Sequence, residues 1–283
     1  MNVSTETFAT AQIVGEQKAI EYIAKAGFDA YDLSMFNMIR REGAEIFAGD
    51  HPLGGKDYIK HVKMIRRVAE DNGIFCNQSH APYYGYMDKV GDFIKMAIEC
   101  ASEVGAKTCV VHPDAFAGVE EVAEKYFKIL PFAKEHGVKI LTENIWNMVN
   151  GEVTPIVASN EKSMRELLGL IDDEYFGVCL DVGHAEMQGV KTSAVKLIKD
   201  IGGRLCGLHI HDNDLIHDQH IMPGNGKIDF HAIVKALKEN NYKGEFTLEA
   251  DRHLIGISEE KVFEELKNLY ASVKRLADEF ESL

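Results

Sequence analysis

The sequence lacks several features that define other protein classes. Its five cysteines are odd in number and form no C-x-x-C pair, which favours free buried thiols in a reducing compartment over a disulfide scaffold. No apolar run approaches the roughly 18 residues of a membrane span, and the first residues, MNVSTETF, have neither the basic nor the apolar part of a signal peptide. We therefore expect a cytoplasmic protein that does not contact the membrane.

Positive charge is scarce as well. The chain has 31 Lys and Arg residues against 45 Asp and Glu residues, and its formal net charge is -14. Such a charge repels polyanions at long range, and no loop is rich in Arg or Lys. The composition therefore disfavours nucleic acid as a partner, although bound metal ions would reverse the field locally.

A glycine-rich phosphate loop is also missing. The sequence contains no G-x-G-x-x-G, and its one G-x-G, Gly224 to Gly226, follows a polar loop instead of a strand. We interpret this glycine pair as part of a turn. The absence argues against a doubly wound, dinucleotide-binding sheet.

What the sequence does contain is a regular alternation of short apolar runs and longer segments of helical period, without a linker. This order is typical of βα units around a parallel sheet. Eight such units in 283 residues match the size of a closed α/β barrel of the (β/α)8 type. We predict one domain over residues 1–283, with strands at 1–8, 28–34, 74–80, 108–112, 139–143, 177–181, 205–209 and 245–249.

Two helices are especially clear. One contains Val122, Tyr126 and Ile129 and ends near Gly137, a residue type that suits a helix C-cap. The last helix repeats apolar residues at three- and four-residue steps from Phe263 to Phe280. This spacing gives the helix one apolar face that can pack on the sheet.

The most informative pattern is that the predicted strands end in acidic or imidazole side chains. Any one of them could cap a loop or pair with a basic neighbour. Gathered in one barrel mouth, however, they would repel one another unless a cation compensated them. The residues at or just after strand ends are Asp32, His80, His112, Glu143, Asp181, His184, His209, His211 and Glu249.

Four of these residues form the predicted metal site: Glu143, Asp181, His209 and Glu249. They offer three carboxylates and one imidazole, a donor set that suits one divalent ion of Mn, Mg, Co or Zn. Further coordination positions would remain for substrate oxygens.

The strand-end strings resemble those of the xylose isomerase-like TIM barrels, a group that holds sugar and sugar-phosphate isomerases and epimerases, inosose dehydratases and endonuclease IV. The resemblance covers nearly the whole chain and implies a TIM barrel. The strings that carry it are HAPY at His80, VVHP at His112, ENIW at Glu143, DVGHA at Asp181, HIHDND at His209, DQHIMPGNGKIDF at Asp218 and the strand-ending Glu249.

For the epimerase branch, the resemblance implies that a bound divalent ion polarises a sugar carbonyl and holds the enediolate that forms when a C–H proton leaves. Glu143 and Glu249 would be the acid and base on opposite faces of the sugar. His184 would bond a substrate oxygen, and Trp146 would cover an apolar face of the sugar or serve only in packing. The remaining residues expected around the substrate are His80, His112, His211, Asp218 and His220.

The choice between His209 and His211 as the metal ligand stays open, because both side chains point to the same face of a strand. We choose His209, since His209 and Asp212 show the H-x-x-D spacing of the family. Some epimerases use the second histidine of an H-x-H, and in that case His211 would be the ligand.

The same resemblance supplies the main alternative, a tri-zinc phosphodiesterase of the endonuclease IV type that cuts abasic sites. Its whole ligand pattern is present, but basic loops for phosphate contacts are missing. An inosose dehydratase-type lyase and a noncatalytic sugar-binding barrel are further alternatives. Loops 35–55 and 148–160 indicate no particular substrate, although the absence of a basic cluster slightly favours an unphosphorylated sugar. A homo-oligomer is expected of the family.

Overall fold

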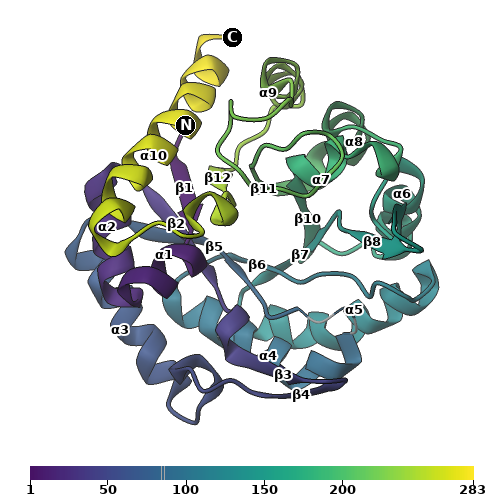
Figure 1. The fold of residues 1–283 in the computed structure, drawn as a ribbon. Helices are drawn as coiled ribbons and strands as arrows, with labels where there is room; N and C mark the ends of the chain where they lie inside the picture. Colours follow the sequence, from purple (N-terminus) through teal and green to yellow (C-terminus); the bar gives the residue numbers. More distant parts are fainter. Residues whose placement is uncertain (84, 86) are drawn as a thin grey trace.

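Eight parallel strands form the inner wall of the molecule (Figure 1). This computed structural model describes residues 1–83, 85 and 87–283. Neighbouring strands follow the order β11-β10-β7-β6-β5-β2-β1-β12. Their bounds are β1 Val3–Glu6, β2 Ala30–Ser34, β5 Phe75–His80, β6 Thr108–Val110, β7 Lys139–Glu143, β10 Phe176–Asp181, β11 Leu205–His209 and β12 Phe246–Leu248.

The two end strands of this sheet meet just beyond β11. Ile210 forms a parallel bridge with Leu248, and its N–H donates to the Thr247 carbonyl at 2.8 Å while its carbonyl accepts from the Glu249 N–H at 3.0 Å. These bonds bring the sheet into a nearly closed barrel. The predicted (β/α)8 TIM barrel and all eight predicted strands are confirmed.

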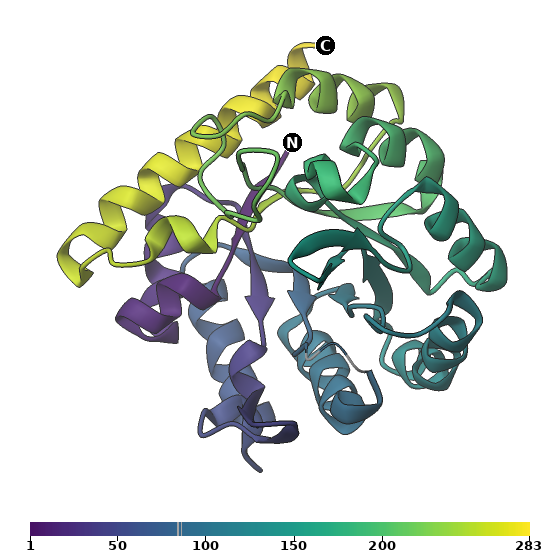
Figure 2. The same ribbon diagram turned by 45° about the vertical axis from the view of Figure 1, so that its right-hand side comes forward.

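Helices surround this wall, and the long C-terminal helix α10 lies beside the N-terminal strand (Figures 1 and 2). The predicted C-cap of α5 is confirmed, because Gly137 follows the helix with a φ of +66°. The apolar face of α10 is buried, as its spacing predicts. The α-helices are α1 Phe8–Val14, α2 Glu16–Ala26, α3 Tyr58–Asp71, α4 Met87–Val104, α5 Val119–Glu135, α6 Glu161–Leu170, α7 Val182–Glu186, α8 Ala194–Ile201, α9 Phe230–Glu239 and α10 Glu259–Ser282.

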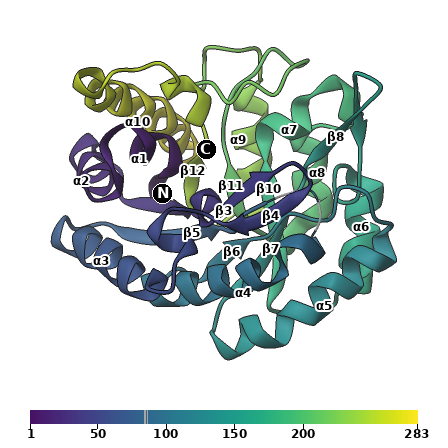
Figure 3. The same ribbon diagram turned by 60° about the horizontal axis from the view of Figure 1, so that its bottom comes forward.

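Two β-hairpins interrupt the βα connections where the sequence pattern gives no signal. The first, β3 Ile39–Glu42 with β4 Glu45–Ala48, lies beside α4 (Figure 3). The second joins β8 Trp146–Val149 to β9 Glu152–Pro155. None of their strand residues is buried, so they carry no alternation of buried apolar and exposed polar residues from which they could be recognised.

Short 3-10 turns complete the connections: η1 Phe36–Met38, η2 Pro52–Gly54, η3 Gln188–Val190, η4 Gly202–Arg204 and η5 Asp251–Leu254. All five cysteines are free, and only Cys206 is partly exposed. Among the described residues, no helix combines the length and the apolar character that crossing a membrane requires. The single-domain organisation, the cytoplasmic location and the homo-oligomer stay predictions.

Candidate metal centre

The barrel brings the four predicted metal ligands to one place at the carboxyl ends of its strands. Glu143 ends β7, Asp181 ends β10 and His209 ends β11, while Glu249 follows β12 directly. All four residues are buried, and one ligand atom from each lies within 4.8 Å of the others. The carboxyl ends of parallel strands lie at the same end of a barrel, which explains this convergence.

A second group adjoins these four residues and shares Glu143 with them. Nε2 of His112 lies 2.9 Å from Oε2 of Glu143 and 2.9 Å from Nε2 of His80. His80 comes from the end of β5, and His112 lies two residues beyond β6. Two imidazoles and a carboxylate at this spacing are a further candidate cation site.

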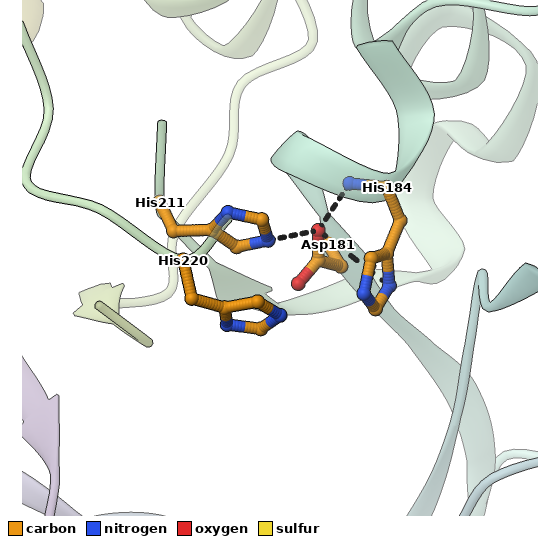
Figure 4. A group of neighbouring side chains, drawn as sticks. All are labelled: Asp181, His184, His211 and His220. Carbon is orange, nitrogen blue, oxygen red and sulfur yellow. Dashed lines mark hydrogen bonds and ion pairs between the residues drawn. The ribbon is translucent and has the colours of Figure 1, made fainter. Parts of the chain in front are cut away.

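A third group lies on the other side of Asp181 and contains His184, His211 and His220 (Figure 4). The rings of His211 and His220 are stacked, with centroids 3.8 Å apart. Oδ1 of Asp218 lies 3.0 Å from Nε2 of His220 and 3.5 Å from Nε2 of His184. The structure therefore brings the predicted metal ligands and the predicted histidines and Asp218 together in three adjoining groups.

His209 and His211 are both completely buried, but they face different groups. Nδ1 of His209 lies 3.3 Å from Oε2 of Glu143 and 3.4 Å from Oε2 of Glu249. Nε2 of His211 lies 3.1 Å from Oδ1 of Asp181 and 3.8 Å from Oδ1 of Asp218. The geometry thus makes His209 the imidazole of the four-residue group and His211 a member of the third group.

The ring nitrogens show why a cation suits these groups. Nδ1 of His80 lies 2.9 Å from the Ala81 carbonyl, Nδ1 of His184 lies 3.2 Å from the Asn144 carbonyl, and Nδ1 of His220 lies 2.8 Å from the Glu249 carbonyl. A carbonyl only accepts hydrogen bonds, so each Nδ1 carries the proton and each neutral ring has its lone pair on Nε2. Those lone pairs face carboxylate oxygens or another ring nitrogen.

A lone pair that faces a carboxylate is repulsive unless a proton or a metal ion lies between them. Several atoms of the group also lack any hydrogen-bond partner although they are buried, namely Oδ2 of Asp181, Nδ1 of His209, Oδ1 of Asp218 and Nδ1 of His112. Unpaired buried polar atoms are costly and call for a compensating group. The residues present therefore fit a bound divalent ion.

The two glutamates of the centre differ in proton affinity. Burial raises the pKa of Glu143, but the neighbouring His209 and His112 outweigh it and hold this pKa well below its usual range. For Glu249 burial prevails, and its pKa lies well above the usual range, helped by the charge of Glu143. Two carboxyl groups with separated pKa values are the usual arrangement of a base and an acid.

Two of the histidines beside Asp218, His184 and His220, have raised pKa values. Burial lowers the pKa of His184, yet the charges of Asp181 and Asp218 overcome it and raise this pKa to about 9. Asp218 and Glu249 act on His220 in the same direction. In contrast, burial lowers the pKa of His112 to about 4. Protons on His184 and His220 therefore occupy the positions for which a metal ion would compete.

Asp212 organises the loop that carries Asp218 and His220, a role that the sequence analysis did not assign. Its buried carboxylate accepts from the N–H groups of Gly224 at 2.8 Å, Gly226 at 2.9 Å and Ile228 at 3.1 Å. The expected turn at the two glycines is confirmed, because the Asn225 N–H donates to the Met222 carbonyl at 3.1 Å and Gly224 has a φ of +97°. Asp212 therefore anchors this loop to the segment that follows β11.

A cavity of about 300 Å³ opens onto the centre. Its polar side includes Glu143, His184 and Glu249, together with the predicted substrate residues His112, Asp218 and His220. Its apolar side is formed by Phe36, Tyr83, Ile145 and the predicted Trp146. Asp181, His80, His209 and His211 do not line the cavity and lie buried behind it.

One arginine lies at the rim of this cavity. The Arg252 guanidinium donates to the Asp218 carbonyl and lies 3.5 Å from the Asp218 carboxylate. Among the described lining residues it is the only Arg or Lys. Its side chain is half exposed, and its charge is already opposed by that of Asp218.

Curated relatives of this chain have several activities. It is 27% identical to the uncharacterized protein MJ1311 of Methanocaldococcus jannaschii over 249 residues, 82% of this chain and 78% of that protein. It is 23% identical to a fructoselysine 3-epimerase of Shigella flexneri, over 72% of this chain and 75% of that one. A probable endonuclease 4 of Staphylococcus aureus is 28% identical but matches only 54% of this chain and 55% of its own length.

Solved structures share the fold at low identity. A D-tagatose 3-epimerase-like protein superposes with a TM-score of 0.70 at 22% identity, over 97% of this chain and 99% of that one. The IolI protein with a binding zinc atom superposes with a TM-score of 0.73 at 17% identity, over 96% and 98% of the two chains. Residues 20–275 match the family described as xylose isomerase-like TIM barrel. The chain belongs to that family.

Proposed function

We propose that this protein is a divalent-metal-dependent sugar epimerase or isomerase. The observation that carries the proposal is the pair Glu143 and Glu249, which line one cavity and have pKa values displaced in opposite directions. An epimerisation beside a carbonyl needs one group that removes a proton and one that returns it. The two glutamates supply such a pair.

Glu143, Asp181, His209 and Glu249 would hold the metal ion. When bound, the ion supplies a Lewis acid that polarises a carbonyl and its neighbouring hydroxyl and thereby acidifies the C–H between them. Glu143 accepts a proton from carbon, and Glu249 donates one. His184, which lines the same cavity, bonds a substrate oxygen through Nε2.

The cavity wall favours a small, uncharged polyol. Phe36, Tyr83 and Trp146 offer aromatic faces that suit the C–H face of a sugar ring or chain. Arg252 already interacts with Asp218, so its charge is not free for a phosphate group. The proposal is therefore an unphosphorylated ketose or related polyol, in line with the fructoselysine 3-epimerase among the relatives.

The test is exchange of the C–H proton with solvent. The protein, supplied with Mn²⁺, Co²⁺ or Zn²⁺, is incubated in D₂O with a panel of ketoses, ketose phosphates and inososes. Proton NMR should show loss of the signal at the carbon beside the carbonyl and growth of an epimer. A dehydratase would instead release water and give an unsaturated or deoxy product. No exchange with any member of the panel contradicts the proposal.

A second candidate is the three-metal phosphodiesterase. The observation that favours it is the overlap of several candidate cation groups at the strand ends, which share Glu143 and Asp181 among other residues. The endonuclease relative supports it over about half of the chain. The single cationic Arg252 on the cavity wall and the net charge of -14 speak against a DNA backbone as substrate.

Metal content separates the two candidates. After purification and dialysis, about one tightly held ion per chain is expected of the epimerase, against about three zinc ions for the phosphodiesterase. Nicking of a duplex that contains an abasic site is the matching activity assay. Three ions together with nicking, and no proton exchange on sugars, would replace the first proposal by the second.

A further inference from the structure

Asp32 lies behind the metal centre, where it contacts the buried residue His209. It sits on β2, is 1% exposed and does not line the cavity. Its Oδ2 atom lies 3.1 Å from Nε2 of His209. Because a carboxylate accepts and the ring nitrogen donates, this contact leaves the His209 lone pair on Nδ1, the atom that faces Glu143 and Glu249.

Gln78 fixes Asp32 in turn. Its side-chain amide on β5 donates to the same Oδ2 atom at 2.7 Å. The register of β2 against β5 shifts between Tyr31 and Asp32, so that Asp32 lies opposite Gln78 and not opposite Asn77. Bulges of this kind redirect side chains next to functional sites.

Gly207 leaves room for the Gln78 side chain as it crosses the barrel interior. A Cβ atom at Gly207 would lie 2.8 Å from Oε1 of Gln78 and 3.0 Å from Leu141. Gly207 is two residues before His209 on β11 and therefore points to the same face of that strand. The packed side chains of Asp32 and Gln78 thus support His209 on the side of its Nε2 atom.

From these contacts we infer that Asp32 is a positioning residue for the metal ligand His209, and that Gln78 positions Asp32. A carboxylate behind a ligating histidine fixes the tautomer and the ring orientation, and makes the coordinating nitrogen more basic. The inference rests on the metal site of the proposed function and deepens it. It is independent of which sugar, if any, the protein converts.

The experiment compares Asp32→Asn, Gln78→Met and the control Glu99→Gln with the parent chain. Glu99 is a half-buried carboxylate on α4 that accepts a hydrogen bond from the Tyr58 hydroxyl of α3. Neither Glu99 nor Tyr58 lines the cavity or belongs to a candidate metal group of the described residues. Zn²⁺ affinity is measured by competition with a chelator, and the ring nitrogens of His209 by ¹⁵N NMR.

Asp32→Asn should weaken Zn²⁺ binding about 10- to 100-fold, while the folded chain keeps its circular dichroism spectrum. Gln78→Met should weaken binding in the same direction but less, and Glu99→Gln should leave it unchanged. In the zinc-loaded parent, the His209 proton should reside on Nε2, and its resonance should move upfield in Asp32→Asn because the acceptor loses its charge.

Unchanged zinc affinity in a folded Asp32→Asn variant would overturn the inference, and so would a His209 proton found on Nδ1. A parent chain that binds no divalent ion would overturn it together with the metal site. Loss of zinc affinity in Asp32→Asn, with no turnover of any sugar by the parent, would uphold the positioning role and overturn only the proposed function.

Discussion

Glu143 and Glu249 approach the same atom, Nδ1 of His209, at 3.3 and 3.4 Å, yet their pKa values are displaced in opposite directions. The difference has a physical cause. Glu143 also contacts the imidazoles of His112 and His80, whereas Glu249 is buried with fewer compensating charges. One histidine thus lies between two glutamates whose proton affinities differ in opposite directions from the usual value, the difference that an acid and base pair needs.

This arrangement makes Glu249→Gln the most direct mutational test. The amide keeps an oxygen ligand but cannot exchange a proton, so metal content should be largely retained while turnover falls about 10²- to 10⁴-fold. Metal per chain and proton exchange in D₂O are the two measurements. Unchanged turnover would remove Glu249 from the reaction.

The metal-free protein should lose stability as the pH rises. The folded pKa of His184 is about 9, above its ordinary value of 6.5, so its contribution is fully present below pH 6.5 and is lost as the pH rises towards 9. Urea unfolding of chelator-treated protein across this window measures the effect. Added Zn²⁺ should reverse the trend, because the ion binds the deprotonated ring. A flat profile without metal would contradict the expected charge on His184.

Gly183→Ala should displace His211. A Cβ atom at Gly183 would overlap the imidazole ring of His211, which is completely buried. We expect a loss of about 1–3 kcal/mol in the free energy of unfolding, as for other overpacked sites. Gly203→Ala is the matched control, since nothing lies within 4 Å of the added atom. Equal stabilities of the two variants would show that the His211 ring moves away freely.

Substitutions of Trp146 test whether the aromatic wall of the cavity contacts the substrate. If it covers an apolar face of the sugar, Trp146→Ala should raise KM about 2- to 10-fold with little change in Tm, and Trp146→Phe should restore part of the loss. Steady-state kinetics and thermal melting on the same samples distinguish the roles. A lower Tm with an unchanged KM would assign Trp146 to packing alone.

Several parts of the fold could be predicted because they depend on local patterns. The strand that ends in Glu143 and the helix that ends before Gly137 are visible from apolar runs, period and terminal residues. The hairpin from Trp146 to Pro155 is different, because its strands pair through their backbones, bury no residue fully and leave no side-chain periodicity. The loop-anchoring role of Asp212 is also invisible, since its bonds reach residues 12 to 16 positions away.

The sequence alone determined that acidic and imidazole groups stand at the carboxyl ends of parallel strands, because strand ends are marked locally and parallel strands share an edge. Only the tertiary structure decided that His209 turns Nδ1 towards Glu143 and Glu249 while Asp32 accepts a hydrogen bond from its Nε2. It also decided which glutamate has the raised pKa and which the lowered one. Ring orientation and pKa depend on burial and on charges that the fold brings together from distant positions, and neither can be read from neighbours along the chain.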